Sequence, residues 1–200
     1  MTRTIGIFVF DQVEVLDFAG PYEVFTCASR AMARLTPHAP APFKVVTIGC
    51  GAAMLRARAG LSVLPEASFG DAPALDVLIV PGGVVEAELV KPEVIAWIGA
   101  MAGRCELVAS VCTGALLLAQ AGLLDGKHAT THWDDIDQLR SMFPRVNVDP
   151  GRRWIDQGQV VTSAGISAGI DMSLYLVERL AGRALALATA RLMEYDWREA

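Results

Sequence analysis

The chain has 200 residues, of which 53% are hydrophobic and 20% charged, a composition typical of a globular protein and not of a disordered one. Its formal net charge of −5 argues against a nucleic-acid partner, because phosphate contacts require clustered lysine and arginine. No signal-peptide pattern opens the sequence, and no apolar run approaches the roughly 20 residues of a membrane helix. We therefore expect a cytoplasmic protein without a membrane partner.

The first half of the chain alternates apolar runs with turn residues. Proline suits the first turn of a helix, so Gly20-Pro21 is expected to begin one. The elements predicted in this half are a buried strand at 4–10, a loop at 11–17, a helix from Gly20-Pro21 to about residue 32, a strand at 43–48, a hairpin of 54–55 with 61–64, and a buried strand at 75–80.

The second half continues the alternation, with glycines placed to end helices at 103 and 122 and to break the last one at 182. The elements predicted here are a helix at 92–102, a strand at 106–110, a helix at 115–121, short strands with a helix at 134–142 between 127 and 163, and a helical stretch from 167 to about 195.

Repeated strand and helix segments predict one α/β domain over residues 1–200, with a mostly parallel sheet and helices on both faces. Ligands in such sheets bind beyond the carboxyl ends of the strands. Three segments at such positions carry reactive or flexible residues: Asp17 after the first strand, Gly82-Gly83 after the third, and Cys112 after the fourth.

The segment around Cys112 predicts a nucleophile on a tight turn between a strand and a helix. The small residues Gly114 and Ala115 would allow that turn, and the start of a helix is expected to lower the thiol pKa. The amide of Thr113 is a candidate donor to an oxyanion, and Gly82-Gly83 is expected to supply a second amide, with Gly83 as the donor.

These motifs together resemble the DJ-1/PfpI superfamily of class I glutamine amidotransferase-like proteins. The resemblance rests on residues 76–83, 109–115, 121–126, 129–133 and 162–171, in the expected order along nearly the whole chain. It implies a flavodoxin-like three-layer sandwich, a cysteine nucleophile at 112 and a homodimer.

Within this superfamily the chain is most similar to the branch of isocyanide hydratases and of the amidase-like domains of AraC-type regulators. Residues 16–21 carry that branch's Asp-x-x-Gly-Pro pattern, and Asp17 is similar to the loop-borne acid of the hydratases. The resemblance implies that Cys112 attacks the terminal carbon of an isocyanide, that Asp17 shuttles a proton, and that water releases an N-substituted formamide from a thioimidate. To act as an acid at neutral pH, Asp17 needs a raised pKa, which burial would supply; capping a helix is its alternative role.

Two histidine-dependent activities are not expected. Thr113 stands where PfpI-type peptidases carry a histidine, and no histidine follows His132, whereas class I glutaminases supply one late in the chain. His132 occupies the position of a histidine near the nucleophile in DJ-1 relatives and is expected to orient substrate or line the pocket. Trp133 is expected to line the pocket, with a place in the core as its alternative role. His128 and His132 have metal-like spacing without further ligands, and the four cysteines form no Cys-x-x-Cys pair, so we expect neither metal nor cofactor.

Three other functions remain open. A glyoxalase or deglycase acting on α-ketoaldehydes would use the same cysteine and acid. A redox stress sensor would oxidise Cys112 to the sulfinic acid. A ligand-sensing domain related to AraC-type regulators is the least expected, because the sequence shows no helix-turn-helix part.

Overall fold

The strands at the centre of the molecule are buried on both faces. Every residue of β6 (Val77–Val80) and β7 (Leu107–Val111) is buried, as a parallel sheet covered by helices on both sides requires. Both strands are runs of apolar or small residues without alternation, and the sequence predicted the first of them as buried and the second as a short strand.

The structure is a computed structural model that describes residues 1–199. Its remaining elements are β1 (Arg3–Phe8), α1 (Val15–Leu35), β2 (Phe43–Gly49), β3 (Leu55–Arg56), β4 (Ser62–Val63), β5 (Ala67–Ser68), α2 (Glu86–Leu89), α3 (Pro92–Ala102), α4 (Gly114–Gln120), β8 (His128–Ala129), α5 (Ile136–Met142), β9 (Asn147–Val148), β10 (Trp154–Gln157), β11 (Val160–Ser163), α6 (Ala168–Ala181) and α7 (Arg183–Leu192). Short 3-10 turns lie at Arg58–Gly60 and Trp133–Asp135.

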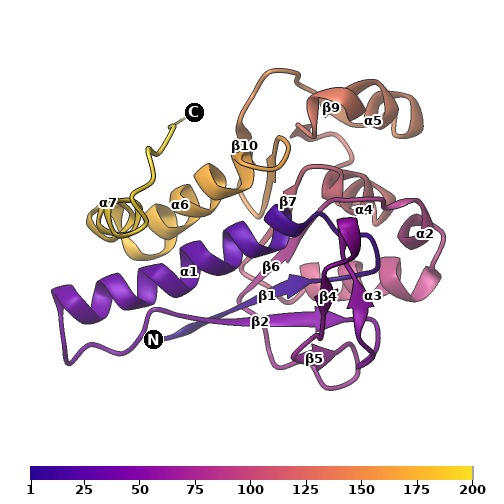
Figure 1. Ribbon diagram of the computed structural model, residues 1–200. Helices are drawn as coiled ribbons and strands as arrows, with labels where there is room; N and C mark the ends of the chain where they lie inside the picture. The colour runs from indigo at the N-terminus through magenta and orange to yellow at the C-terminus, as the bar shows by residue number, and fades with distance from the viewer. Residues whose placement is uncertain (200) are drawn as a thin grey trace.

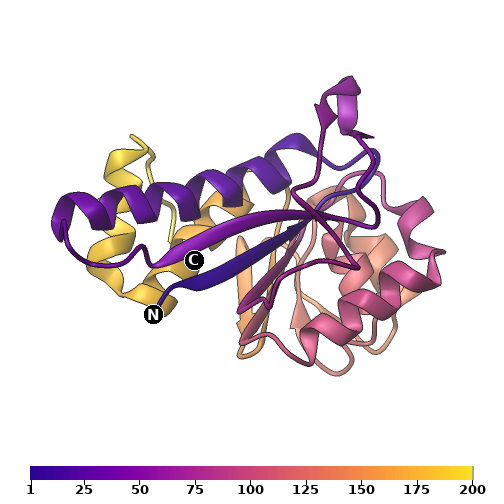
Figure 2. The same cartoon turned by 90° about the horizontal axis from the view of Figure 1, so that it is seen from below.

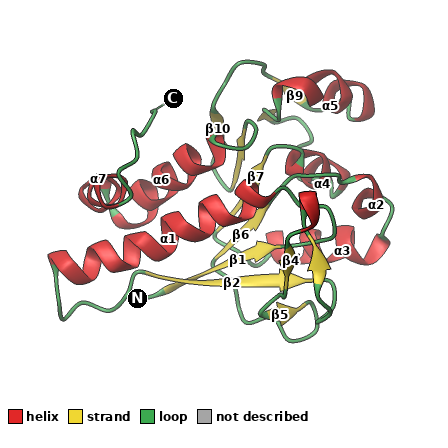
Figure 3. Ribbon diagram, in the orientation of Figure 1, coloured by secondary structure: helices red, strands yellow, loops and turns green. Residues whose placement is uncertain are grey.

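The main sheet has the strand order β10-β11-β7-β6-β1-β2-β5, and all its pairings are parallel except β10 with β11. Helices α1, α6 and α7 pack together on one face, and α3 and α4 cover the other (Figures 1 and 2). This is the predicted α/β architecture, coloured by element type in Figure 3. The strands β7, β6 and β1 are neighbours, so the segments that follow them meet at one edge.

Most predicted elements are present within a few residues of their expected bounds. The hairpin forms as β3 and β4, the helix at 92–102 is α3, and Gly182 separates α6 from α7 with a φ of 95°. Left-handed backbone of this kind favours glycine because other residues meet steric strain there.

The start of α1 corrects the sequence prediction. The helix begins at Val15 rather than at Gly20-Pro21, so Asp17 lies in its first turn and not in a loop. Pro21 stands inside the helix, where its missing N–H costs one helical hydrogen bond that packing of the buried face offsets.

The last helix also differs, because α7 ends at Leu192 and not near residue 195. The short elements α2 and β5 have no counterpart among the predictions. Among residues 1–199, no helix combines the length and the apolar character that a membrane crossing needs.

Candidate active site

Cys112 occupies a sharp turn between β7 and α4. Its φ is 57°, a left-handed conformation that costs energy for a residue with a side chain. Gly114 permits the turn, because a Cβ there would lie 2.1 Å from the carbonyl oxygen of Val80. The Thr131 hydroxyl donates to the Cys112 carbonyl at 2.9 Å and holds the turn from the other side. This geometry is that of a nucleophile elbow, which aims a side chain out of the sheet.

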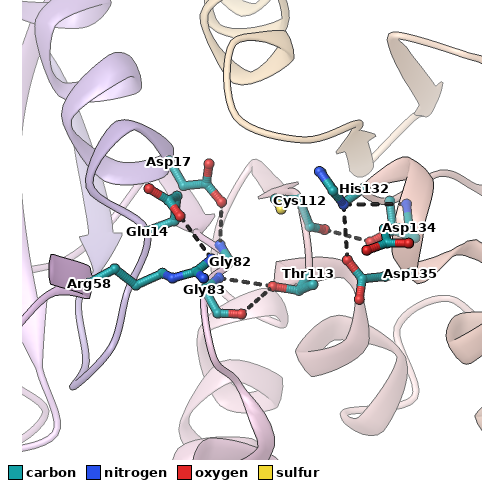
Figure 4. Close-up of polar contacts among 11 residues, drawn as sticks. Glu14, Asp17, Arg58, Gly82, Gly83, Cys112, Thr113, His132, Asp134 and Asp135 are labelled. Carbon is teal, nitrogen blue, oxygen red and sulfur yellow. Dashed lines mark hydrogen bonds and ion pairs between the residues drawn. The ribbon is translucent and has the colours of Figure 1, made fainter.

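The carboxyl group of Asp17 reaches the same place from the first turn of α1 and faces the Cys112 thiol (Figure 4). Asp17 is 0% exposed, and its Oδ2 accepts the N–H of Gly82 at 3.0 Å. Its Oδ1 is buried and has no hydrogen-bond partner within 3.5 Å among residues 1–199. Asp17 does not cap its helix, since Glu14 is the N-cap residue.

Burial raises the pKa of Asp17 from 3.8 to about 7, and the nearby charge of Glu14 adds to this rise. The N–H of Gly82 and the Cys112 thiol act in the opposite direction by hydrogen bonding to the carboxylate. Asp17 therefore changes protonation near neutral pH, as the sequence-based mechanism requires.

The pKa of the Cys112 thiol differs from the sequence prediction. Burial raises the pKa of Cys112 to about 12, and the negative charge of Asp17 contributes to the rise. The backbone N–H groups of Thr113 and Ile166 face the sulfur and lower the pKa by a smaller amount. The predicted lowering of the thiol pKa is thus wrong for the resting site, where the sulfur keeps its proton.

The Gly82-Gly83 loop does not present a free amide. The N–H of Gly82 is bonded to Asp17, and that of Gly83 donates to Thr113 Oγ1 at 2.9 Å. The Thr113 hydroxyl in turn donates to the Gly83 carbonyl at 2.9 Å. This contradicts the prediction of an oxyanion donor at Gly82 or Gly83. The loop instead fixes Asp17 and Thr113, and a Cβ on Gly82 would lie within 2.9 Å of both side chains.

A cavity of about 210 Å³ opens above the sulfur. His132 lines it, with Nδ1 3.2 Å from Asp135 Oδ2 and accepting the N–H of Asp134 at 3.3 Å. The ring lies against Gly165, where a Cβ would be 2.1 Å from its Cδ2 atom. Trp133 does not line this cavity and is 77% exposed, so its prediction as a pocket residue is wrong.

The structure adds five lining residues that the sequence did not single out: Glu14, Arg58, Asp134, Asp135 and Ile166. The two aspartates directly follow His132-Trp133, so their proximity to it was a readable signal. Arg58 and Glu14 are 44 residues apart and meet through an ion pair of 3.1 Å, which no local pattern reveals.

No group of three or more His, Cys, Asp and Glu side chains within residues 1–199 is arranged to hold a metal ion. His128 and His132, which have metal-like spacing, pair separately with Asp149 and Asp135. The two histidines thus have different carboxylate partners.

A family model and several known proteins are similar to this chain over most of its length. A family model described as the DJ-1/PfpI family matches residues 3–179. The isonitrile hydratase of Pseudomonas putida is 36% identical over 197 residues, which are 98% of this chain and 79% of that protein. The HTH-type transcriptional regulator GbdR of Pseudomonas aeruginosa is 31% identical over 194 residues, 97% of this chain but only 51% of the regulator.

Solved structures agree with the fold. A THiJ/PfpI family protein from Pseudomonas syringae superposes with a TM-score of 0.86 at 29% identity, covering 100% of this chain and 77% of that one. Drosophila melanogaster DJ-1beta gives a TM-score of 0.82 at 20% identity over 98% of this chain and 100% of its own.

Proposed function

The chain belongs to the DJ-1/PfpI family, and we propose that within it the protein is a cysteine-dependent enzyme that hydrates isonitriles to N-substituted formamides. The observation that carries this proposal is the buried pair of a protonated Cys112 thiol and an Asp17 carboxyl group that titrates near neutral pH. The similarity to an isonitrile hydratase over 98% of the chain supports it.

The first step adds the thiol S–H across the terminal carbon of the isonitrile. Asp17 accepts the proton from sulfur, the sulfur forms a bond to the carbon, and Asp17 delivers the proton to that same carbon. The product is a thioimidate, and no atom leaves. A neutral thiol beside a carboxylate holds the one proton that this addition consumes, so the raised pKa of Cys112 fits the reaction.

The second step hydrolyses the thioimidate. Water adds to its carbon, the carbon–sulfur bond breaks, the nitrogen gains one proton and the sulfur regains the other, which releases the formamide. Negative charge that develops on the sulfur in both steps faces the N–H groups of Thr113 and Ile166.

Substitution at the pair tests the proposal. Cys112→Ala is expected to abolish turnover of alkyl and aryl isonitriles, and Asp17→Asn to lower kcat/KM by about a hundredfold or more, as loss of proton transfer does. Cys50→Ser is the matched control, because Cys50 is exposed and lies outside the site, and should keep full activity. Intact mass after rapid quench should show an adduct equal to the whole isonitrile. Turnover by Cys112→Ala would end the covalent mechanism.

Asp17 also sets the expected pH dependence. The carboxylate form accepts the thiol proton, so kcat/KM should rise with pH and level off above the Asp17 pKa of about 7. Membership of the DJ-1/PfpI family further supports a homodimer, and light scattering in solution would measure its mass.

A second candidate function is ligand sensing. It is favoured by the match of this chain to about half the length of a transcriptional regulator. In that case isonitriles or other small electrophiles would bind the cavity without turnover, and calorimetric binding with no formamide product would distinguish it from catalysis.

A further inference from the structure

The cavity above Cys112 is bordered by more acidic than basic side chains. Glu14, Asp134 and Asp135 line it, against Arg58 and His132. Arg58 is ion-paired with Glu14, and His132 Nδ1 lies 3.2 Å from Asp135 Oδ2. Asp134 is exposed and makes no salt bridge among residues 1–199. The border therefore keeps a carboxylate that no protein cation neutralises.

Further acidic groups add to this field. Burial raises the pKa of Asp135, and the charges of Asp134 and Glu86 raise it further while His132 lowers it. Next to Cys112, the fully buried Asp17 carries an oxygen without a hydrogen-bond partner among the described residues. Burial is the largest cause of the raised pKa of Cys112, and the negative charges of Asp17 and Asp135 raise it further. Negative potential thus extends from the rim to the reacting atom.

An exposed aromatic ring accompanies the acids. Trp133 is 77% exposed, lies between His132 and Asp134 in the chain, and has its ring centroid 5.5 Å from that of His132. Trp133 does not itself line the cavity, but its ring lies next to His132, which does, so an exposed indole is available to an ammonium group close to the cavity through a cation–π interaction.

We propose that this site selects small substrates that carry a positively charged group, an ammonium on the nitrogen substituent of the isonitrile. The substrate class rests on the proposed function, whereas the charge preference of the cavity does not. The cavity of about 210 Å³ suits a small substituent. A bound cation would also offset the acidic field at the sulfur, so the substrate itself would favour the ionised thiol during attack.

An isosteric pair of substrates measures the preference. In 2-(trimethylammonio)ethyl isocyanide and 3,3-dimethylbutyl isocyanide, only a nitrogen cation and a carbon atom differ. At low salt we expect kcat/KM to be about tenfold higher for the cationic substrate than for its neutral isostere, since the attraction of one nearby carboxylate supplies an effect of that size. At high salt this ratio of kcat/KM values should be smaller, because ions screen the attraction. An isocyanide with a carboxylate in place of the ammonium should be the poorest substrate. Equal kcat/KM for cation and isostere would overturn the proposal.

Asp134→Asn should reduce the cation-to-isostere ratio severalfold. Asp137→Asn is the matched control, because Asp137 is 95% exposed, lies on the next helix and does not line the cavity. Its ratio should equal that of the unmodified chain. A ratio that is unchanged by Asp134→Asn, or lowered equally by both substitutions, contradicts a role for the cavity rim.

Thiol modification tests the same preference without isonitrile turnover. In a Cys50→Ser background, methanethiosulfonates bearing a trimethylammonium or a sulfonate group would form a disulfide with Cys112 and release methanesulfinate and a proton. Each rate constant with Cys112 is divided by the rate constant of the same reagent with a small free thiol. We expect this relative rate to be about tenfold higher for the cationic reagent than for the anionic one, and Asp134→Asn to reduce that difference. Equal relative rates would overturn the inference. A cation preference without isonitrile turnover would sink the proposed function alone.

Discussion

The carboxyl group of Asp17 is fully buried with only one of its oxygens bonded, so its ionisation costs folding free energy. The folded-state pKa of about 7 lies above the ordinary value of 3.8. A raised pKa means that the folded chain holds this proton more tightly than the unfolded chain. The contribution of the Asp17 proton to folding stability is therefore fully present below about pH 4 and is lost as the pH rises to about 7.

This linkage predicts a pH-dependent effect of Asp17→Asn on stability. The unmodified chain should lose up to roughly 4 kcal/mol of unfolding free energy from this residue between pH 4 and pH 8. The variant should lack that contribution, so its stability relative to the unmodified chain should improve with pH. Urea unfolding at several pH values measures it, with the exposed Asp137→Asn as control. If the difference in unfolding free energy between the variant and the unmodified chain does not change with pH, folding does not raise the pKa of Asp17.

Cys112 illustrates a related limit on reading residues singly. A cysteine before a helix predicts a lowered thiol pKa, but burial and the facing Asp17 raise it to about 12. The sequence identified both residues and the rise in the Asp17 pKa. It missed the state of the thiol, because desolvation depends on every segment packed around the sulfur.

At the level of elements, the tight contact between the end of β6 and the start of α4 sets the shape of the elbow. Gly114 lies in this contact, where a Cβ would be 2.1 Å from Val80 O and 2.8 Å from Pro81 O. Both neighbours are backbone atoms, which cannot move without displacing a strand that is buried on both faces. The glycine is therefore required by packing.

Gly114→Ala is expected to destabilise the fold by about 3 kcal/mol, because overpacking against backbone forces the helix away from the strand. Gly99→Ala is the matched control within α3: its Cβ would meet nothing within 4 Å, so it should stabilise by up to about 1 kcal/mol. Chemical denaturation of both variants measures the difference. Similar effects of the two substitutions would mean that the elbow tolerates a side chain.

The boundaries of α1 show where local signals mislead. Gly20-Pro21 is typical of a helix start, yet the helix begins at Val15 and continues through Pro21. Packing of α1 against β2, α6 and α7 outweighs the single missing hydrogen bond. By contrast, α3 and the strand β7 lie where their apolar patterns placed them, since nothing outside those segments opposes the local preference.

Across the whole molecule, Asp171 ties three distant segments together. It is fully buried in α6, accepts from Arg153 Nε at 2.6 Å before β10, and accepts the N–H of Arg198 at 2.9 Å. Its carbonyl accepts from Trp197 Nε1 at 3.2 Å. The edge of the sheet, helix α6 and the C-terminal segment therefore share one carboxylate.

Asp171→Asn should cost about 3 kcal/mol of unfolding free energy, because it leaves the partly buried Arg153 guanidinium without its counter-ion. Glu178→Gln breaks the more exposed pair with Arg183 and should change stability by less than about 1 kcal/mol. Thermal unfolding of the two variants compares them. Equal losses would mean that burial adds nothing to the Asp171 pair.

The sequence by itself determined the α/β class, the order of the strands along the chain, and the two residues that meet at the site, Cys112 and Asp17. These follow from apolar periodicity, turn residues and motifs, which are properties of contiguous residues. Only the tertiary structure decided that β7, β6 and β1 are neighbours, that the amides of Gly82 and Gly83 already have acceptors, and that Trp133 does not line the cavity. The protonation of the thiol and the acidic border belong to this second group, because burial and charge at one point sum over segments that are far apart in the chain.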